Sequence, residues 1–345
     1  MKLKYLYSII ILCLTAAAYT GCSCAETNET EDRETDTFFE GADYIDTRLK
    51  AEKEYNFFFV NGAVENPYFI ELCRGIADAD DYYLVHTEVI GSDAMDEEET
   101  FEAFKQAVAA GADGILSQML PGDKYGEYIN QVIDQGVAVV FVDSDGKAFQ
   151  EDEKYKDSDL TCLGIDNYEA GWEIGKLLSE EMEGHANVGI LSGNTGAFHL
   201  SSRIEGFTDA IKEYPEMKIL TSGYSYGSLE TGMMQVENMM QKYDLDAIFC
   251  VTATDIISAA RIMEEREETA VLAGFDDLDA TLRYISEGKV LATVAQNQYE
   301  AGWLGVEELI RTLQEKPEGN RVLDTGFTLI TQDNVEKFIH KWTGI

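Results

Sequence analysis

Positive charge is scarce in this chain. It has 26 lysines and arginines against 65 aspartates and glutamates, and its formal net charge is -39. A protein binds nucleic acid by bringing cations to the phosphates, so this balance excludes a nucleic-acid partner. It argues equally against electrostatic docking on an anionic membrane. The acidic excess is interpreted as a solubilising surface.

Cysteine is also rare in the part of the chain that is expected to fold. Three of the six cysteines lie within the first 24 residues, and the others are Cys73, Cys162 and Cys250. These three are far apart and form no CxxC pair, which argues against a zinc site and against a redox motif. They are expected to be buried single thiols. Neither a metal nor a cofactor is predicted.

The sequence lacks the motifs that accompany catalysis. Its four histidines form no HExxH pair, and no GxSxG elbow is present. The glycine-rich loop 192–196 follows a predicted strand and could cradle a phosphate, but it has neither the P-loop lysine nor the dinucleotide spacing. Residues 143–146 begin like a calcium loop, yet the twelfth position is Lys154 instead of glutamate. The chain is therefore predicted not to be an enzyme.

The first 24 residues differ from the rest of the chain. Lys2 and Lys4 precede an apolar segment, 6–18, that is too short to be a stable membrane anchor, which is typical of a secretory signal. Residues 19–22, Tyr-Thr-Gly-Cys, resemble the end of a bacterial lipoprotein signal, although that family prefers leucine where Tyr19 stands. The resemblance implies that Cys22 carries the lipid. Ordinary cleavage, or lipidation of Cys24, remains the alternative.

A segment rich in Glu, Thr and Asp comes after the signal. It contains too few apolar residues to offset the entropy of ordering. We predict a signal peptide over 1–22 and an acidic flexible tether over 23–53, which joins a lipid anchor to the folded body.

From residue 55 onward, apolar runs of strand length alternate with helix-patterned segments. Repeated βα units imply right-handed crossovers and parallel sheets, and the acid-rich loop 146–159 divides them into two sets. We therefore predict an α/β protein with two similar lobes, each a parallel sheet flanked by helices. The expected strands are 55–60, 83–89, 114–117, 137–142, 162–165, 188–191, 219–224, 247–251, 270–275, 290–295 and 327–330. The expected helices include 97–110, 125–135, 168–182, 229–243, 255–265, 278–287 and 334–342, with further helices from Pro67, around Arg203 and from Tyr299.

Polar residues follow many of these strands, where an open parallel sheet forms its ligand crevice. Carboxylates and a guanidinium at such positions suit the recognition of vicinal hydroxyls, each of which both donates and accepts. Each residue alone is better explained as a helix cap or a surface group, but six at equivalent positions favour a binding site. Asp276 and Gln296 are expected in the same cleft. The six positions are Asn66, Asp143, Arg203, Thr254 or Asp255, Asp276 and Gln296.

The chain resembles the type I periplasmic binding proteins, in the ribose- and galactose-binding branch of ABC-transporter receptors. The resemblance implies that Asn66, Asp143, Arg203, Asp276 and Gln296 bond sugar hydroxyls and the ring oxygen, and that Tyr68 and Phe69 stack on the ring. The pieces that carry it, in family order, are 66–69 (Asn-Pro-Tyr-Phe), 141–143 (Phe-Val-Asp), 202–207 (Ser-Arg-Ile-Glu-Gly-Phe), 273–276 (Ala-Gly-Phe-Asp) and 288–296 (Gly-Lys-Val-Leu-Ala-Thr-Val-Ala-Gln).

Two departures from the family pattern bear on the ligand. The aromatic residue expected after Tyr224 is Tyr226 or is replaced by Gly227, and Thr254 stands in place of the ribose-type asparagine. The ligand is therefore not assigned as ribose. Lactose-repressor-type regulators share the fold, but they need an N-terminal DNA-binding helix pair, where this chain has a signal peptide and an acidic balance.

The resemblance also implies the lobe boundaries and the function. The N-terminal lobe is expected over 54–165 and 297–322 and the C-terminal lobe over 166–296 and 323–345, joined by a three-segment hinge. The expected function is that of a monomeric, lipid-anchored receptor outside the cytoplasm that delivers a monosaccharide or similar polyol to the transmembrane subunits of an ABC permease. A sensory sugar receptor that signals to a histidine kinase or chemoreceptor is the alternative.

Overall fold

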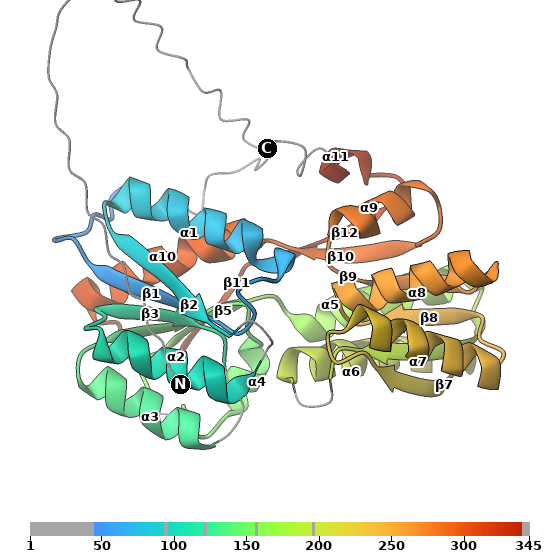
Figure 1. Ribbon diagram of the computed structural model, residues 1–345, viewed down its shortest axis with the longest axis horizontal. Coiled ribbons are helices and arrows are strands. Elements are labelled where there is room, and N and C mark those ends of the chain that lie inside the picture. Colours follow the sequence, from blue (N-terminus) through green and yellow to red (C-terminus); the bar gives the residue numbers. More distant parts are fainter. Residues whose placement is uncertain (1–44, 93–95, 120–122, 156–157, 195–196, 340–345) are drawn as a thin grey trace, which may run out of the picture. The chain divides into compact units, whose positions relative to one another are not determined.

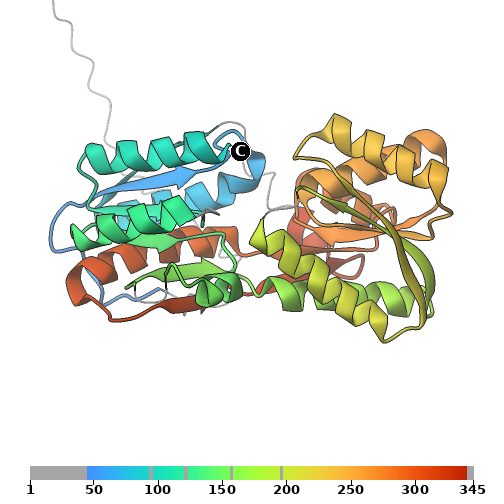
Figure 2. The same cartoon turned by 90° about the horizontal axis from the view of Figure 1, so that it is seen from below.

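A computed structural model describes residues 45–92, 96–119, 123–155, 158–194 and 197–339 (Figure 1). Within these ranges the chain forms two six-stranded sheets, each with helices on both faces (Figures 1 and 2). The predicted class, an α/β protein with two similar lobes, is confirmed. The predicted signal peptide and Cys22 lie outside the described residues.

The first sheet has the strand order β11-β5-β4-β3-β1-β2, and all of its strands are parallel. Its central strands β3 and β4 are buried along their whole length, which explains their short, uninterrupted apolar sequences. The strands are β1 (Asn56–Asn61), β2 (His86–Gly91), β3 (Gly114–Ser117), β4 (Ala138–Phe141), β5 (Thr161–Gly164) and β11 (Arg321–Asp324).

The second sheet repeats this order position by position as β12-β10-β9-β8-β6-β7. One strand departs from the predicted parallel arrangement, because β12 pairs antiparallel with β10. The chain leaves β10 at the hinge and returns from the hinge into β12, so the two strands run in opposite directions. The strands are β6 (His185–Ser192), β7 (Glu216–Tyr224), β8 (Ala247–Cys250), β9 (Val271–Phe275), β10 (Ala292–Gln296) and β12 (Phe327–Thr331).

The helices bury an apolar stripe against each face of the two sheets, which gives four core clusters. The helices are η2 (Pro67–Phe69), α1 (Ile70–Tyr83), α2 (Glu97–Ala109), α3 (Asp123–Asp134), α4 (Gly146–Glu151), α5 (Asn167–Glu181), α6 (Phe198–Lys212), α7 (Leu229–Lys242), α8 (Ala253–Arg266), α9 (Asp279–Ser286), α10 (Gln298–Glu315) and α11 (Glu336–Ile339). None of the described helices is both long enough and apolar enough to cross a membrane.

Three local predictions need correction. The expected strand 83–89 begins only at His86, because Tyr83 still belongs to α1 and Leu84 caps that helix in the left-handed conformation. The expected acidic loop 146–159 contains α4, whose first turn is capped by Asp145 accepting from the Ala148 amide at 2.7 Å. Residues 321–324, which contain the expected lobe boundary at 322/323, form β11.

The chain passes between the lobes at three places, as predicted for the hinge. These places lie between β5 and α5, between β10 and α10, and between β11 and β12. The third crossing is at Thr325 and Gly326, slightly beyond the expected boundary at 322/323. Asn297 donates from Nδ2 to the Thr325 carbonyl at 2.7 Å, so the second and third crossings are hydrogen-bonded to each other.

The end of the predicted tether is part of the folded N-terminal lobe. Leu49 is buried, and Ile45 and Ala51 pack against the same core. The expected tether, 23–53, is therefore too long at its C-terminal end. The side chains there are apolar enough to bury, although the surrounding segment is rich in acid.

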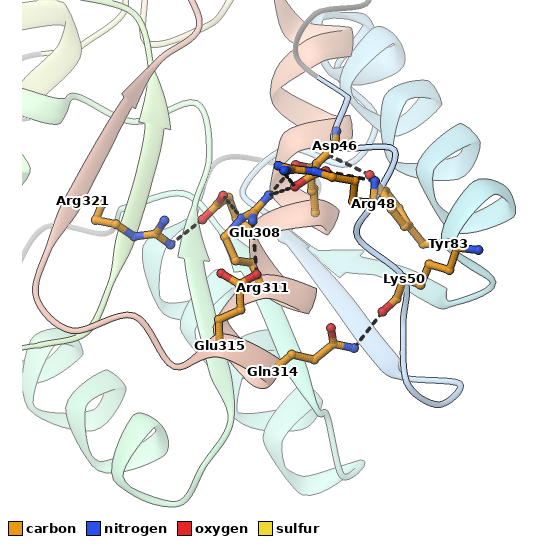
Figure 3. Close-up of polar contacts among 10 residues, drawn as sticks. Asp46, Arg48, Lys50, Tyr83, Glu308, Arg311, Gln314, Glu315 and Arg321 are labelled. Carbon is orange, nitrogen blue, oxygen red and sulfur yellow. Dashed lines mark hydrogen bonds and ion pairs between the residues drawn. The ribbon is translucent and has the colours of Figure 1, made fainter.

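An ion-pair network fixes this segment to α10 (Figure 3). Arg311 contacts Asp46 at 3.4 Å, Glu307 at 2.9 Å and Glu308 at 3.1 Å. Arg321 of β11 bonds the other Glu308 oxygen. The nearly buried pair Glu307 and Glu308 therefore has cationic partners, which a buried carboxylate requires.

Glycines let two helix pairs approach closely, one pair in each lobe. A Cβ added to Gly75 of α1 would lie 2.0 Å from the Tyr299 carbonyl oxygen of α10. In the C-terminal lobe, a Cβ at Gly171 of α5 would lie 2.1 Å from the Arg203 carbonyl oxygen of α6. Both distances are far below van der Waals contact. A side chain at either position forces the two helices apart.

Replacing Gly75 by alanine is expected to lower the free energy of unfolding by about 1–3 kcal/mol, because overpacking outweighs the better helix propensity of alanine. Urea unfolding of the folded body measures this change. The control is Ala77→Ser, at an exposed position of the same helix, with an expected change within about 0.5 kcal/mol. Equal stability of Gly75→Ala and the parent protein would contradict the close approach.

Candidate functional site

Two aspartates occupy equivalent strand ends in the two sheets. Asp143 follows β4 and Asp276 follows β9, and these strands hold the same place in the two strand orders. Both residues have left-handed backbone conformations, with φ of 51° and 73°. Such conformations are uncommon outside glycine and cluster at functional sites. The repeated fold therefore brings two unusual aspartates to the same edge of the two lobes.

Asp276 is almost fully buried and its carboxylate is held from two sides. Oδ1 accepts from Gln296 Nε2 at 2.9 Å, and Oδ2 accepts from the Ala253 amide, the first residue of α8, at 3.0 Å. The expected proximity of Asp276 and Gln296 is confirmed by this contact. Burial raises the pKa of Asp276 to about 6, although Arg203, Gln296 and the Ala253 amide favour its charged form.

Asp143 is held by an equivalent set of donors in the N-terminal lobe. Its Oδ1 accepts from the Tyr68 hydroxyl at 2.7 Å and from Gln298 Nε2 at 3.0 Å, and its Oδ2 accepts from Gln118 Nε2 at 3.3 Å. Burial raises the pKa of Asp143, whereas these hydrogen bonds and the charge of Arg203 oppose the rise. Each lobe thus presents one carboxylate that is supported by neutral donors.

Arg203 supplies the cation. Its Nε donates to Asn167 Oδ1 at 2.9 Å, its Nη1 donates to the Val251 carbonyl at 3.0 Å, and its guanidinium lies 4.0 Å from the centre of the Phe275 ring. Its charge favours the ionised forms of both Asp143 and Asp276. Three predicted site residues, two from one lobe and one from the other, therefore belong to one electrostatic cluster.

Other predicted site residues are placed differently. The Oδ1 of Asn66 accepts from the Tyr68 amide at 3.1 Å and caps η2, as the capping alternative anticipated. Phe69 is only 4% exposed and packs edge-to-face on Phe59, so the core covers most of the ring that was expected to stack on a ligand. Burial in the core removes more of the apolar surface of Phe69 from water than a polar cleft would.

Tyr226 and Thr254 both belong to the C-terminal lobe. Tyr226 is 68% exposed and has a φ of 52°, and its ring centre is 6.2 Å from that of Tyr224. Thr254 is half-buried in the first turn of α8. Its alternative, Asp255, is completely buried and accepts from the Thr252 hydroxyl at 2.7 Å. Asp255 is therefore engaged inside the C-terminal lobe.

Three amide residues that the sequence reasoning did not select take part in the cluster: Gln118, Asn167 and Gln298. Each directly follows a strand or a hinge crossing, the same position that singled out Asp143 and Gln296. This positional signal was available in the sequence. Neutral amides carry less chemical specificity than charged residues, and their partners are distant along the chain.

The positions of two surface hollows do not identify this cluster as the site. An open hollow of about 510 Å³ beside Lys53, Asp80 and Tyr83 contains none of the predicted site residues. A smaller one of about 190 Å³ lies at the hinge, beside Asp145, Asn167 and Asp324. In the described part of the chain no three His, Cys, Asp or Glu residues are arranged to hold a metal ion. The chemistry available at the cluster is therefore hydrogen bonding and charge.

Residues 57–317 match the family model described as the periplasmic binding protein domain. The chain belongs to this family. Among curated proteins, the ribose import binding protein RbsB of Haemophilus influenzae is 24% identical over 263 residues, covering 76% of this chain and 87% of the relative.

Solved structures of the family agree with the fold. The glucose-galactose binding protein GanP from Geobacillus stearothermophilus is 27% identical, with a TM-score of 0.75 and coverage of 82% of this chain and 99% of that chain. A chain of the XylFII-LytSN complex is 25% identical, with a TM-score of 0.73 and coverage of 81% and 99%. These relatives are named as binding proteins or by their complex, not as enzymes, which agrees with the prediction that no reaction is catalysed.

The raised pKa of Asp276 predicts that the free energy of unfolding depends on pH. Because the folded state holds the proton more tightly than the unfolded chain, the contribution of Asp276 to stability is fully present below pH 4 and is lost as pH rises through about 6. Asp276→Asn removes this dependence. Relative to the parent protein, the variant should therefore gain about 2–3 kcal/mol in free energy of unfolding between pH 4 and pH 7.5.

Urea unfolding at several pH values measures this difference. The substitution also alters the bonds to Gln296 and Ala253, which adds an offset that does not depend on pH. Asp255, whose pKa is also raised to about 6, is present in both proteins, and the charge of Asp276 contributes less to that pKa than burial and the hydrogen bonds of Asp255 do, so most of its effect cancels. A stability difference that stays constant from pH 4 to pH 7.5 would show that Asp276 is not the titrating group.

Proposed function

We propose that this protein captures a monosaccharide or similar polyol between its lobes and delivers it to the transmembrane subunits of an ABC permease. The observation that carries the proposal is the cluster of Asp143, Asp276 and Arg203, assembled from equivalent edges of two parallel sheets. Ligands of such folds bind at the carboxyl ends of the strands. The names of RbsB and GanP, a ribose import and a glucose-galactose binding protein, support a sugar as the class of ligand.

A polyol suits the chemistry of this cluster. Two carboxylates accept from vicinal hydroxyls, while a guanidinium and amide groups donate to hydroxyl or ring oxygens. Nε and Nη1 of Arg203 are bonded inside the C-terminal lobe, so we assign Nη2 to the ligand. Gln296 joins Asp276 on one side of the sugar.

The remaining contacts are assigned to the periphery of the ligand. Asn66 has its amide nitrogen available in this scheme, since its oxygen caps η2. Tyr68 provides the larger aromatic surface and the edge of Phe69 the smaller one. Tyr226 and Thr254 complete the contact set from the C-terminal lobe, where Tyr226 is exposed enough to fold over a ligand.

Ligand binding is coupled to closure of the hinge in this proposal. A sugar that contacts both aspartates has greater affinity for the closed than for the open arrangement, and this differential affinity shifts the equilibrium. The receptor is proposed to act as a monomer held outside the cytoplasm by a lipid on Cys22. Mass spectrometry of the mature protein tests the lipid, and an unmodified N-terminus at another residue would overturn it.

A sensory receptor is the second candidate function. The XylFII-LytSN complex shows that a relative of 25% identity assembles with a second protein. In this alternative function, the closed form of the receptor signals to a membrane histidine kinase or chemoreceptor. Neighbouring genes separate the two: a permease with its ATPase favours transport, whereas a histidine kinase alone favours sensing.

A thermal-shift screen of pentoses, hexoses and inositols tests ligand binding. A ligand that binds only the native state at 100 times its Kd stabilises the protein by about 2.7 kcal/mol, so at least one sugar should raise the melting temperature by several degrees. The control is Arg203→Ala, which should lose the response. No shift with any sugar at millimolar concentration would contradict the proposal.

Asp276→Ala should weaken binding of the sugar found in this screen by about 10- to 150-fold, because a charged hydrogen-bond partner contributes roughly 1.5–3 kcal/mol. Isothermal titration calorimetry at pH 7.5 measures the affinity. The matched control is Asp279→Ala, an exposed aspartate three residues further on, which should leave the affinity unchanged. A loss of less than threefold for Asp276→Ala would remove Asp276 from the site.

A further inference from the structure

Two helices begin directly after the chain has crossed the hinge, and both begin with a buried amide residue. α5 starts at Asn167 after the first crossing, and α10 starts at Gln298 after the second. Asn167 is 3% exposed and Gln298 is 8% exposed. Polar side chains are rarely buried to this degree without a specific partner.

The two residues occupy equivalent places in the lobes. α5 follows β5 and α10 follows β10, and these strands hold the same position in the two sheets. Each helix then packs into the lobe that it enters, α10 with Trp303 and Val306 in the N-terminal core and α5 with Ile174 and Leu178 in the C-terminal core.

Gln298 bonds the cleft residues of the lobe that α10 enters. Its Nε2 donates to Asp143 Oδ1 at 3.0 Å and also contacts the Tyr68 hydroxyl, which itself donates to the same Asp143 oxygen at 2.7 Å. One amide group therefore holds two residues to which the proposed function assigns ligand contacts. The side chain connects them to the backbone at the hinge.

Asn167 bonds the cleft cation of the lobe that α5 enters. Its Oδ1 accepts from Arg203 Nε at 2.9 Å, and its Nδ2 donates to Asp145 Oδ2 at 3.2 Å. Asp145 lies in the other lobe, where it caps α4. The amide thus orients the guanidinium and ties it to a residue across the hinge.

Neither amide is needed to cap its helix. In α5 the side chain of Asp166, not of Asn167, caps the helix by accepting from the Glu169 amide at 2.9 Å. In α10 the cap residue is Asn297, and its side chain makes no cap bond. In addition, Gln298 Oε1 is buried with no hydrogen-bond partner among the described residues. An unsatisfied buried acceptor destabilises the fold.

We propose that the first residue of each crossing helix is a positioning residue: Gln298 holds Asp143 and Tyr68, and Asn167 holds Arg203, in the geometry that binds the ligand. This inference rests on the proposed function for its consequence, namely ligand affinity. The bonds themselves are testable without a ligand. Because each amide sits where the chain bends, movement of the hinge and orientation of the charged groups are mechanically linked.

The ligand-free experiment compares Gln298→Met with Gln314→Met. Gln314 lies on the same helix and donates to the Lys50 carbonyl at 3.0 Å, away from the cluster (Figure 3). Carbon-13 NMR titration of the aspartate carboxyls reports the pKa of Asp143, which also faces Tyr68, Arg203 and Asp276. Loss of the donor at 298 should raise that pKa, whereas Gln314→Met should not change it. An unchanged pKa of Asp143 in Gln298→Met would overturn the inference, whether or not a sugar binds.

The ligand-bound experiment is a double-mutant cycle on sugar affinity. Gln298→Met should weaken binding about 5- to 30-fold in the parent protein and clearly less in the Asp143→Ala background, where only its contact with Tyr68 remains. Gln314→Met should have no effect in either background. An equal loss in both backgrounds would make Gln298 a direct ligand contact and not a positioning residue.

The same cycle applies to the other lobe. Asn167→Leu should weaken sugar binding in the parent protein and have less than a twofold effect in the Arg203→Lys background. Lysine has no Nε group to donate the hydrogen bond that Asn167 Oδ1 accepts from Arg203. Failure of the proposed function gives a different pattern: no sugar binds the parent protein, while the pKa of Asp143 still responds to Gln298→Met. The two failures are therefore distinguishable.

Discussion

The cost of burying charge is the constraint on which this site depends. Asp143 and Asp276 are carboxylates at the edges of two lobes, and each is removed from water by the fold around it. Desolvation disfavours the charged form of both carboxyls and raises their pKa values. Arg203 and a set of amide and hydroxyl donors compensate, and they come from elements that are far apart in the sequence: η2, α6, β10 and α10.

The duplicated architecture makes this assembly possible. Because the two sheets have the same strand order, the aspartates that follow β4 and β9 lie at equivalent positions. For the same reason the chain leaves the lobes at equivalent positions after β5 and β10. Closely packed helix pairs then fix the helix that begins after each exit. Gly75 permits α10 to approach α1, and Gly171 permits α6 to approach α5 at the carbonyl of Arg203 itself. The position of the guanidinium therefore depends on a residue without a side chain on a neighbouring helix.

Most of the regular elements were predictable, because an apolar run between turn residues leaves a buried parallel strand few alternatives. The predicted and observed spans of β3, α2, α7 and β9 differ by at most one residue at either end. Short elements were harder. α4 is only six residues long and is defined by the cap at Asp145, and β11 is a strand only because β5 offers it an edge. Its sequence alone carries no such information.

The candidate site divides in the same way. The sequence by itself determined that Asp143, Asp276 and Gln296 lie at the ends of strands, since strand ends are fixed by local pattern, and it determined the acidic balance that excludes nucleic acid. Only the tertiary structure decided which side chains turn toward one another. In that structure Phe69 lies mainly in the core, and Asp255 is hydrogen-bonded inside the C-terminal lobe. Gln298 bonds Asp143, which is 155 residues away in the sequence. Whether a hydrogen bond forms depends on differences of a few tenths of an ångström in the distance between groups distant in sequence, and that distance is set by packing.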